Sequence, residues 1–289
     1  MGIILGIDAG GTKTEFTTYN EEGQVLHDIK LNAGNIIVDE QHTLETLQIG
    51  VRKILSLERQ KCDEIVAGIA GIETSGNQKV VEKELGKYSP KVTVISDAKL
   101  GLFNKLKGRE GVLLISGTGS VAYGLKNGKF YRVGGWGHII GDEGSAYSIA
   151  IKMYKKLAKD IDYEGEISAF SRAFINYLGY KSPKDALKSV YNMNKGEVAK
   201  AAKFLNYVDM DVQFKISLID EVTDDLSKLV KGIVTKMSVE RCSLALAGSV
   251  LEKNRDIREK LSEKLNGIVG SIILNDESNT KGAFYFHKR

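Results

Sequence analysis

Short apolar and alternating runs in the first 110 residues predict a sheet covered by helices. Strands are predicted where the run is apolar or alternates with a period of two, over residues 3–8, 14–19, 24–31, 64–69 and 91–96. Apolar residues at helical spacing predict helices over 39–57, with Asp39 as its cap, and over 77–85. Another helix is predicted to begin at Asp97. Three strands followed by alternating helices and strands indicate an α/β fold with a mixed sheet.

The pattern restarts at Gly111. Strands are predicted over 112–116, 120–125 and 129–133, with Asn127-Gly128 as a hairpin turn. The opening three-stranded meander is thus repeated about 110 residues later, which indicates two copies of one fold.

The remaining chain is predicted to be mainly helical before the strands return. A helix capped by Asp142 is expected over 141–156, and residues 157–241 carry no strong strand pattern. The final elements are a strand, a helix, a strand and a short helix, over 242–247, 250–265, 269–274 and 280–287. We therefore expect an N-terminal domain over 1–110 and a C-terminal domain over 111–289, the latter with a helical insertion near 157–241.

Composition excludes several classes of protein. The 289 residues carry 41 basic and 37 acidic side chains without a dense basic tract, which disfavours a nucleic-acid partner. The opening apolar run is too short for a membrane helix or a signal peptide, so no membrane partner and a cytoplasmic location are expected. Two cysteines, Cys62 and Cys242, form neither a disulfide framework nor a metal cluster.

The first candidate site follows the first strand. Asp8 is followed by Gly10, Gly11, Thr12 and Lys13. Glycines let backbone N–H groups approach an anion closely, and the hydroxyl and ammonium groups add donors. Asp8 is suited to holding Mg²⁺ through water. The motif is not a P-loop, because a strand follows it rather than a helix. A glycine hairpin without a ligand is the alternative.

A similar turn opens the second half, at Gly117–Ser120. With Ala122 it matches the dinucleotide fingerprint, but that fingerprint needs a helix after the turn and a strand pattern follows here. NAD is therefore rejected, and Thr118 and Gly119 are interpreted as a second phosphate-binding turn.

Asp97 lies where a strand ends and a helix begins. A helix cap is the simplest role for such a residue. A general base is the functional alternative, because active sites in α/β sheets favour the carboxyl ends of strands.

Two glycine-containing segments are further candidates. Five glycines surround Trp136, the only tryptophan, between residues 134 and 144, which indicates a loop whose backbone lies close to a small polar ligand. His138 lacks the neighbours that a metal site needs. Gly248 and Ser249 join a predicted strand to a helix, where a flat base or a phosphate could lie close, or where a strand–helix connection simply needs a glycine.

Together these motifs resemble the sugar-kinase/actin/heat-shock-protein ATPase superfamily. Residues 134–147 narrow the resemblance to the N-acetylglucosamine kinase family of the BadF/BadG/BcrA/BcrD ATPase type. The resemblance covers the chain in motif order, strongly at 6–20, 95–101, 112–147 and 243–253. It implies an α/β fold of two RNase H-like (actin-like ATPase) domains with a nucleotide and sugar cleft between them.

The resemblance also implies roles for individual residues. Asp8 corresponds to the Mg²⁺-positioning carboxylate and Asp97 to the catalytic base. Nucleotide contacts are implied for Gly10, Gly11, Thr12, Lys13, Thr118, Gly119, Ala199, Gly248, Ser249 and Lys253. Sugar contacts are implied for Asn35, Asp97, Ser120, Val121, Gly135, Trp136, Gly137 and Asp142. The adenosine motif departs from many relatives in reading Ala-Gly-Ser rather than Gly-Gly.

These implications define the expected reaction. ATP, with Mg²⁺, would phosphorylate the 6-hydroxyl of N-acetylglucosamine, with Asp97 accepting the hydroxyl proton. N-acetylmuramic acid, glucosamine or a range of hexoses remain as alternative substrates. Homodimers are common among relatives, and the sequence leaves the oligomeric state open.

Two other classes are weighed against the kinase. Relatives that activate dehydratases hold an iron–sulfur cluster through paired cysteines, whereas Cys62 and Cys242 lie far apart in sequence. Sugar-sensing regulators carry an added DNA-binding segment, whereas this chain begins at its first strand.

Overall fold

The computed structural model describes residues 2–163, 167–207, 211–275 and 277–289. The chain divides into two compact units. Unit 1 comprises Met1–Glu110 with Asn275–Arg289, and unit 2 comprises Gly111–Leu274.

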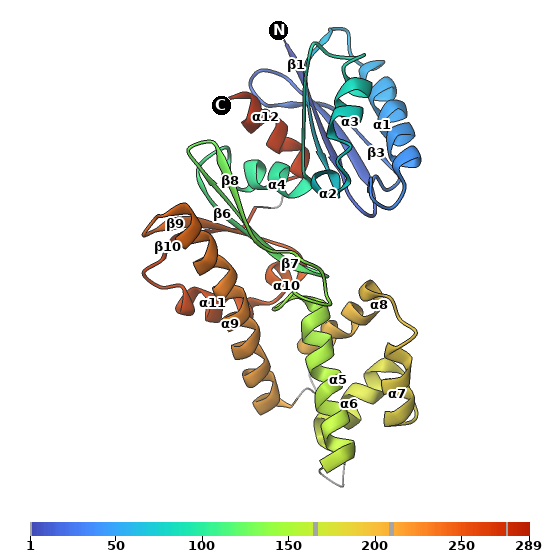
Figure 1. The fold of residues 1–289 in the computed structure, drawn as a ribbon, viewed down its shortest axis with the longest axis vertical. Helices are drawn as coiled ribbons and strands as arrows, with labels where there is room; N and C mark the ends of the chain where they lie inside the picture. The colour runs from blue at the N-terminus through green and yellow to red at the C-terminus, as the bar shows by residue number, and fades with distance from the viewer. Residues whose placement is uncertain (1, 164–166, 208–210, 276) are drawn as a thin grey trace. The chain divides into compact units, whose positions relative to one another are not determined.

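Unit 1 is built on a five-stranded mixed sheet in the order β3-β2-β1-β4-β5 (Figure 1). Its strands are β1 (Ile3–Ala9), β2 (Thr14–Tyr19), β3 (Val25–Leu31), β4 (Cys62–Ile69) and β5 (Lys91–Ile95). The first three strands form an antiparallel meander, and β4 and β5 continue from β1 in parallel. The carboxyl ends of β1, β4 and β5 therefore lie at one edge of the sheet.

Unit 2 repeats this sheet in the order β10-β9-β6-β7-β8. Its strands are β6 (Gly111–Ser116), β7 (Ser120–Lys126), β8 (Lys129–Gly134), β9 (Cys242–Ala247) and β10 (Val269–Ile273). The antiparallel meander β6-β7-β8 and the parallel strands β9 and β10 reproduce every pairing of unit 1. The predicted repeat of one α/β fold is confirmed.

Helices cover both faces of the unit 1 sheet (Figure 1). The helical segments are α1 (Glu40–Leu55), α2 (Ile72–Ser75), α3 (Gln78–Leu85), α4 (Asp97–Leu106), the 3₁₀ turn η2 (Asn279–Lys281) and α12 (Gly282–His287). On one face Leu47, Val51 and Leu85 of α1 and α3 pack against the sheet. On the other face Leu100 of α4 and Ala283 of α12 pack against β1 and β4.

The last fifteen residues belong to unit 1, whereas the sequence analysis assigned them to the C-terminal domain. The cause is a close fit against β1 and β2. A Cβ at Gly6 would overlap the backbone oxygen of Thr280. The buried Thr280 hydroxyl bonds to the hydroxyls of Thr17 and Tyr19, each at 2.9 Å. The sequence motifs do not predict either of these contacts.

Unit 2 has a larger helical part, most of it placed between β8 and β9 in sequence and the rest between β9 and β10. Its helical segments are α5 (Ala146–Tyr163), α6 (Ala169–Leu178), α7 (Pro183–Val190), α8 (Lys195–Lys200), the 3₁₀ helix η1 (Ala201–Asn206), α9 (Val212–Met237), α10 (Ser249–Lys253) and α11 (Arg255–Lys264). The predicted helical character of 157–241 is confirmed, and residues 164–166 and 208–210 of that segment lie outside the described residues. Among the described residues, no helix has the length and apolarity needed to cross a membrane.

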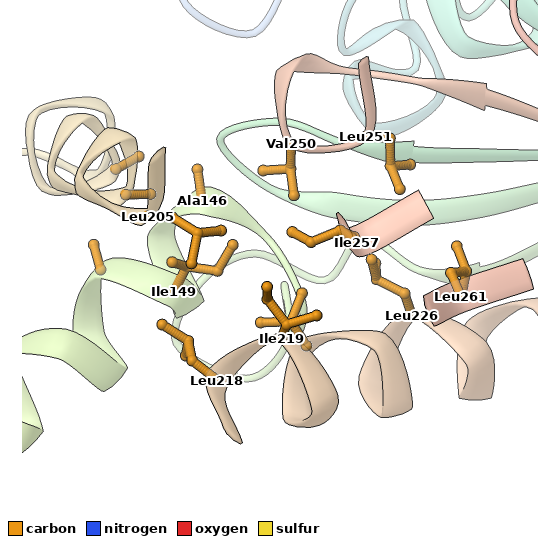
Figure 2. Close-up of a cluster of buried hydrophobic side chains, with 14 of the residues drawn as sticks. Ala146, Ile149, Leu205, Leu218, Ile219, Leu226, Val250, Leu251, Ile257 and Leu261 are labelled. Carbon is orange, nitrogen blue, oxygen red and sulfur yellow. The ribbon is translucent and has the colours of Figure 1, made fainter. Parts of the chain in front are cut away.

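One continuous core joins these helices to the unit 2 sheet. Figure 2 shows side chains of α5, α9 and the α10–α11 region converging, among them Ile149, Leu226, Leu251 and Ile257. All four are fully or almost fully buried. The helical insertion is therefore part of the core of unit 2 rather than an appended segment.

Two predicted helices are wrong in their bounds. Residues 141–145 form a loop, and α5 begins only at Ala146, because Asp142 and Gly144 adopt left-handed conformations with φ of 63° and 75°. Ser145, not Asp142, accepts from the first turn of α5, at the backbone N–H of Ser148. The helix predicted over 250–265 is broken at Asn254, whose φ of −114° and ψ of 102° are extended.

Gly50 of α1 provides a test of packing in unit 1. Glycine is less favourable than alanine in a helix interior by about 1 kcal/mol, so Gly50→Ala would stabilise an unpacked helix. Here a Cβ would overlap the ring of Phe16, which is completely buried. Overpacking of this kind costs about 1–3 kcal/mol, so a net loss of unfolding free energy is expected in denaturant titrations.

The matched control is Gly101→Ala in α4. A Cβ there would lie 3.5 Å from the nearest atom of Asn279, an ordinary contact. This variant is expected to be neutral or stabilising. A stabilised Gly50→Ala protein would show that the ring of Phe16 can move away at little cost.

Candidate functional site

Asp8 lies at the carboxyl end of β1, immediately before the first glycine turn. The turn is closed by a backbone hydrogen bond from Gly10 to Lys13 of 3.0 Å, and residues 11–13 are exposed. The Lys13 ammonium lies 2.7 Å from Glu15 Oε1. The turn therefore presents backbone N–H groups, a hydroxyl from Thr12 and a partly neutralised ammonium to solvent.

The Asp8 carboxyl has a strongly perturbed pKa. Burial, and next the charge of Asp97, raise the pKa of Asp8 to about 7. The amide Nδ2 of Asn279, in η2, donates to Asp8 Oδ2 at 3.3 Å and opposes that rise. A side chain of the C-terminal segment therefore donates a hydrogen bond to the Asp8 carboxylate.

Asp97 is the first residue of α4, directly after β5. Ser96 is the N-cap of the helix, so capping does not account for Asp97. Asp97 Oδ1 accepts from the Ala98 N–H at 2.9 Å. A Cβ at Gly68 of β4 would lie 2.6 Å from Leu100 Cβ and 3.2 Å from Asp97 Cα, so the glycine lets the start of α4 lie against the sheet. Burial, together with the charge of Glu73, raises the pKa of Asp97.

Asn35 lies on a loop tied to the same sheet edge. The neighbouring Gly34 donates to the Gly10 carbonyl at 2.9 Å, and Asn35 bridges to Ala70 beyond β4. Asn35 Oδ1 accepts from the backbone of Ile37 at 3.1 Å. Unit 1 therefore gathers Asp8, Asp97, the first turn and the Asn35 loop at the carboxyl ends of its parallel strands.

The second glycine turn, Gly117–Ser120, has the corresponding place in unit 2. Gly117 donates to Gly119 at 2.9 Å, and the Gly117 carbonyl accepts from Ala146 at 2.8 Å. The Ser120 hydroxyl donates to the carbonyl of Glu143 at 2.6 Å. Residues 142–146 therefore hold the turn in place through these hydrogen bonds.

Asp142 is bound to this turn rather than exposed. It is only 3% accessible, and its Oδ1 accepts from the Ser120 N–H at 3.1 Å. Its Oδ2 lies 2.5 Å from the ammonium of Lys195, the first residue of α8. A Cβ at Gly119 would lie within 2.9 Å of both the Asp142 carboxylate and the Lys195 ammonium, so the glycine makes room for this ion pair.

The glycine-rich loop after β8 exposes its aromatic side chain. Trp136 is 69% accessible, and Gly134, Gly135 and Gly137 have φ of 77°, 73° and 90°. The Arg132 guanidinium lies 5.0 Å from the centre of the Trp136 ring and donates to the carbonyls of residues 134 and 135. The loop is thus held by its backbone while the indole ring remains available for contact.

A cavity of about 170 Å³ lies beside the second turn, wholly within unit 2. It is lined by Thr118, Ala146, Gly196, Ala199, Lys200, Ala202, Lys203, Asn206, Ser249, Val250, Lys253 and Asn254. Gly248, which precedes the lining residue Ser249, has a φ of 92°, and a Cβ there would overlap the carbonyl of Ser116. Its lining includes three lysines and, among the described residues, no carboxylate. The lysines suit the cavity to a phosphate-bearing ligand. Its volume suits only part of such a ligand, because pockets that hold a whole ligand typically measure about 300–1,000 Å³.

Four residues singled out from the sequence meet at this cavity: Thr118, Ala199, Ser249 and Lys253. Sequence reasoning missed Lys195, Lys200, Lys203 and Asn279. The three lysines cluster within residues 195–203, which was a detectable signal. Asn279 gave no signal, because its contact with Asp8 spans 271 positions.

The residues around Asp8 fit a magnesium ion. Mg²⁺ in phosphate-transfer sites is held by one or two carboxylates together with water and substrate phosphates. Asp8 offers a half-buried carboxylate next to the charge of Asp97. A cation would offset that repulsion. Among the described residues no group of three or more His, Cys, Asp or Glu could form an all-protein cage, and this kind of site does not need one.

Two equivalent sheets of this topology define the class of actin-like ATPases that includes sugar kinases. Solved structures share the fold over the whole chain. A Chromobacterium violaceum protein, provisionally named an N-acetylglucosamine kinase, has a TM-score of 0.72 at 18% identity and covers 98% of both chains. A Streptomyces griseus ROK family glucokinase in complex with glucose and AMPPNP has a TM-score of 0.58 at 14% identity, covering 98% of this chain and 97% of that one.

The chain belongs to the BadF/BadG/BcrA/BcrD ATPase family, whose pattern it matches over residues 5–283. It is 32% identical to the N-acetylmuramic acid/N-acetylglucosamine kinase of Clostridium acetobutylicum over 92% of this chain and 91% of that protein. It is 23% identical to the N-acetyl-D-glucosamine kinase of Dictyostelium discoideum over 91% and 90%. The chain is accordingly an enzyme, an N-acetylglucosamine kinase-like phosphotransferase of a family that uses ATP.

The raised pKa of the half-buried Asp8 carboxyl makes the stability of the protein depend on pH. Its pKa is about 7 in the folded protein against 3.8 for an unperturbed aspartate, so the folded protein holds a proton that the unfolded chain releases between these values. Unfolding free energy therefore falls as pH rises from about 4 to 7. Asp8→Asn is expected to reduce this fall and to stabilise the metal-free protein at pH 8 by about 1–3 kcal/mol.

Denaturant titrations at pH 5 and pH 8 without divalent ions measure both quantities. Asp63→Asn, at an exposed site in β4, is the matched control and should leave the pH dependence unchanged. Equal pH dependence in the wild type and Asp8→Asn would contradict a raised pKa at Asp8.

Proposed function

We propose that this chain transfers the γ-phosphoryl group of ATP to the 6-hydroxyl of N-acetylglucosamine, with Asp97 as the general base. The observation that carries the proposal is the pair of perturbed carboxyls, Asp8 and Asp97, at the sheet edge that also carries the first glycine turn. Metal binding and proton acceptance are two tasks for which phosphoryl transfer needs carboxylates.

The proposed proton transfer requires ionised Asp97. Its carboxylate would accept a hydrogen bond from the sugar hydroxyl and then the proton, as the hydroxyl oxygen bonds to the γ-phosphorus and the bridging oxygen leaves with ADP. A raised pKa makes Asp97 a better proton acceptor than an exposed aspartate. The Ala98 N–H holds the other side of the carboxylate in place.

The two glycine turns are proposed to bind the phosphates. Gly10, Gly11 and Thr12 would donate backbone and hydroxyl hydrogen bonds, and Lys13 would add charge. Thr118 and Gly119 would do the same from unit 2. Mg²⁺, positioned by Asp8, would neutralise phosphate charge when bound.

The adenosine part is proposed to occupy the cavity beside the second turn. Ala199, Ser249 and Lys253 line it, and Gly248, which precedes Ser249, lies against the carbonyl of Ser116. The lysines along the cavity favour an anionic ligand. Its small volume favours part of the nucleotide, with the phosphates extending toward Thr118.

Sugar contacts are proposed for both units. Asn35 keeps its amide donors for a hydroxyl, since its described side-chain hydrogen bond uses Oδ1. Gly135, Trp136 and Gly137 form an exposed loop whose indole ring suits an acetamido group. Asp142, and Val121 next to Ser120, are also proposed as sugar contacts. Because the Asp142 side chain is only 4% accessible, its contact requires the turn or Lys195 to move when the sugar binds.

N-acetylmuramic acid is the second candidate substrate. Its lactyl carboxylate needs a cation, and Arg132 holds a guanidinium over the Trp136 ring. The relative in Clostridium acetobutylicum is named for both amino sugars. Glucosamine and broader hexoses have no comparable residue in their favour among the described residues.

Activation of a dehydratase is less well supported. It would need thiolates that can hold an iron–sulfur cluster. Burial raises the pKa of Cys62 to about 11 and also raises the pKa of Cys242, and the two thiols belong to different units.

Asp97→Asn tests the general base. This variant keeps the size and one acceptor oxygen of the side chain but cannot take the proton at neutral pH. We expect turnover to fall by roughly 10²–10⁴-fold, while sugar affinity measured by calorimetry changes little. Glu73→Gln is the control, because it removes a neighbouring charge without removing the base. Near-normal turnover in Asp97→Asn, or sugar binding lost together with turnover, would count against the assigned role.

A substrate panel tests the sugar. Mg²⁺-dependent ADP release should be strong with N-acetylglucosamine and weak with glucose and glucosamine, because these two sugars lack the acetamido group that is proposed to contact the Trp136 ring. Turnover with N-acetylmuramic acid as well would support the role of Arg132. Equal turnover with glucose would assign the loop to general sugar binding, and ADP release independent of every sugar would contradict the kinase proposal.

A further inference from the structure

We propose that Lys195 is a phosphate-binding residue of the second glycine turn, held in position by Asp142. The proposal rests on the proposed function and adds a residue to its nucleotide site. Lys195 lies in the helical part of unit 2, far in sequence from the turn at 117–120, and the sequence motifs do not include it.

The ion pair with Asp142 places the ammonium against the glycine of the turn. Lys195 Nζ lies 2.5 Å from Asp142 Oδ2, and a Cβ on Gly119 would lie 2.9 Å from it. The adjacent Thr118 and Gly196 both line the cavity beside the turn. The ammonium is thus next to the backbone that is proposed to carry the nucleotide phosphates.

The chemistry of the ion pair leaves the lysine available. An ammonium has three donors, and the ion pair with Asp142 occupies one direction. The Lys195 side chain is 31% accessible, whereas the Asp142 side chain is 4% accessible. The carboxylate is therefore fixed in the interior, and the ammonium is the partner that faces solvent.

The conformation of Asp142 and the sequence of the second turn both support a positive charge at this turn. Asp142 adopts a left-handed conformation with φ of 63°, which costs energy for a residue other than glycine, and this conformation accompanies its contacts with Ser120 and Lys195. The first turn contains its own lysine, Lys13, whereas the second reads Gly-Thr-Gly-Ser. Lys195 supplies to the second turn the charge that its own sequence lacks.

Lys195→Met tests this by comparing ligands with and without phosphates. Dissociation constants of ATP, ADP and adenosine are measured by calorimetry without sugar, so that the result does not depend on turnover. Loss of a charge-assisted hydrogen bond should weaken ATP and ADP by roughly tenfold or more and leave adenosine unchanged. Lys195→Arg should restore part of the affinity. Lys184→Met, on the exposed surface of α7, is the control and should bind all three ligands normally.

The alternatives give different results. Equal weakening of ATP and adenosine with a lowered melting temperature would overturn the proposal, because Lys195 would then only hold the turn. Unchanged ATP affinity would also overturn it. If the wild type binds ATP and phosphorylates no sugar, the proposed function fails, while selective loss of ATP and ADP affinity in Lys195→Met still supports the phosphate contact.

Discussion

Two carboxyl groups at one sheet edge of unit 1 have pKa values raised mainly by burial, and the chemistry proposed for unit 1 depends on them. Asp8 ends β1 and Asp97 follows β5, and the charge of Asp97 adds to burial in raising the pKa of Asp8. Such an arrangement is unfavourable when both groups are ionised and no cation is near. A nearby cation would relieve this cost, which supports the proposal that Asp8 positions Mg²⁺.

In each unit, glycines at or near the candidate site let the backbone of one element lie close to a neighbouring element. Gly68 lets the start of α4 lie against β4, and Gly6 lets η2 bring Asn279 to Asp8. In unit 2, Gly248 and Gly119 play similar parts beside the second turn. At each of these positions a methyl group would overlap backbone or a neighbouring side chain, so glycine is required by packing.

The sequence predicted most of the architecture because its signals were local. Alternation marked the meanders, and Asn127-Gly128 marked a hairpin whose two residues do have positive φ, of 47° and 75°. The glycine turns and Asp97 were recognised for the same reason. By contrast, residues 275–289 joined unit 1 through tertiary hydrogen bonds of Thr280, and no local pattern reports such contacts.

Asp142 illustrates a different reason for failure. Aspartate before a helical pattern is a common helix cap, and this general tendency led to the prediction of a helix from residue 141. The pairing of its carboxylate with Ser120 and Lys195 instead stabilises a left-handed loop conformation, and α5 starts at Ala146. Lys195 was missed with it, because the sequence shows a cluster of lysines over 195–203 but not that one of them pairs with Asp142.

The most direct test of the central claim is a carboxyl carbon NMR titration of Asp8 in the wild type and in Asp97→Asn, without divalent ions. The account predicts a wild-type pKa near 7 that falls when the charge of Asp97 is removed, yet stays above 3.8 because burial is the larger cause. A wild-type pKa near 4, or one that Asp97→Asn leaves unchanged, would contradict the claim that the two carboxyls share one site.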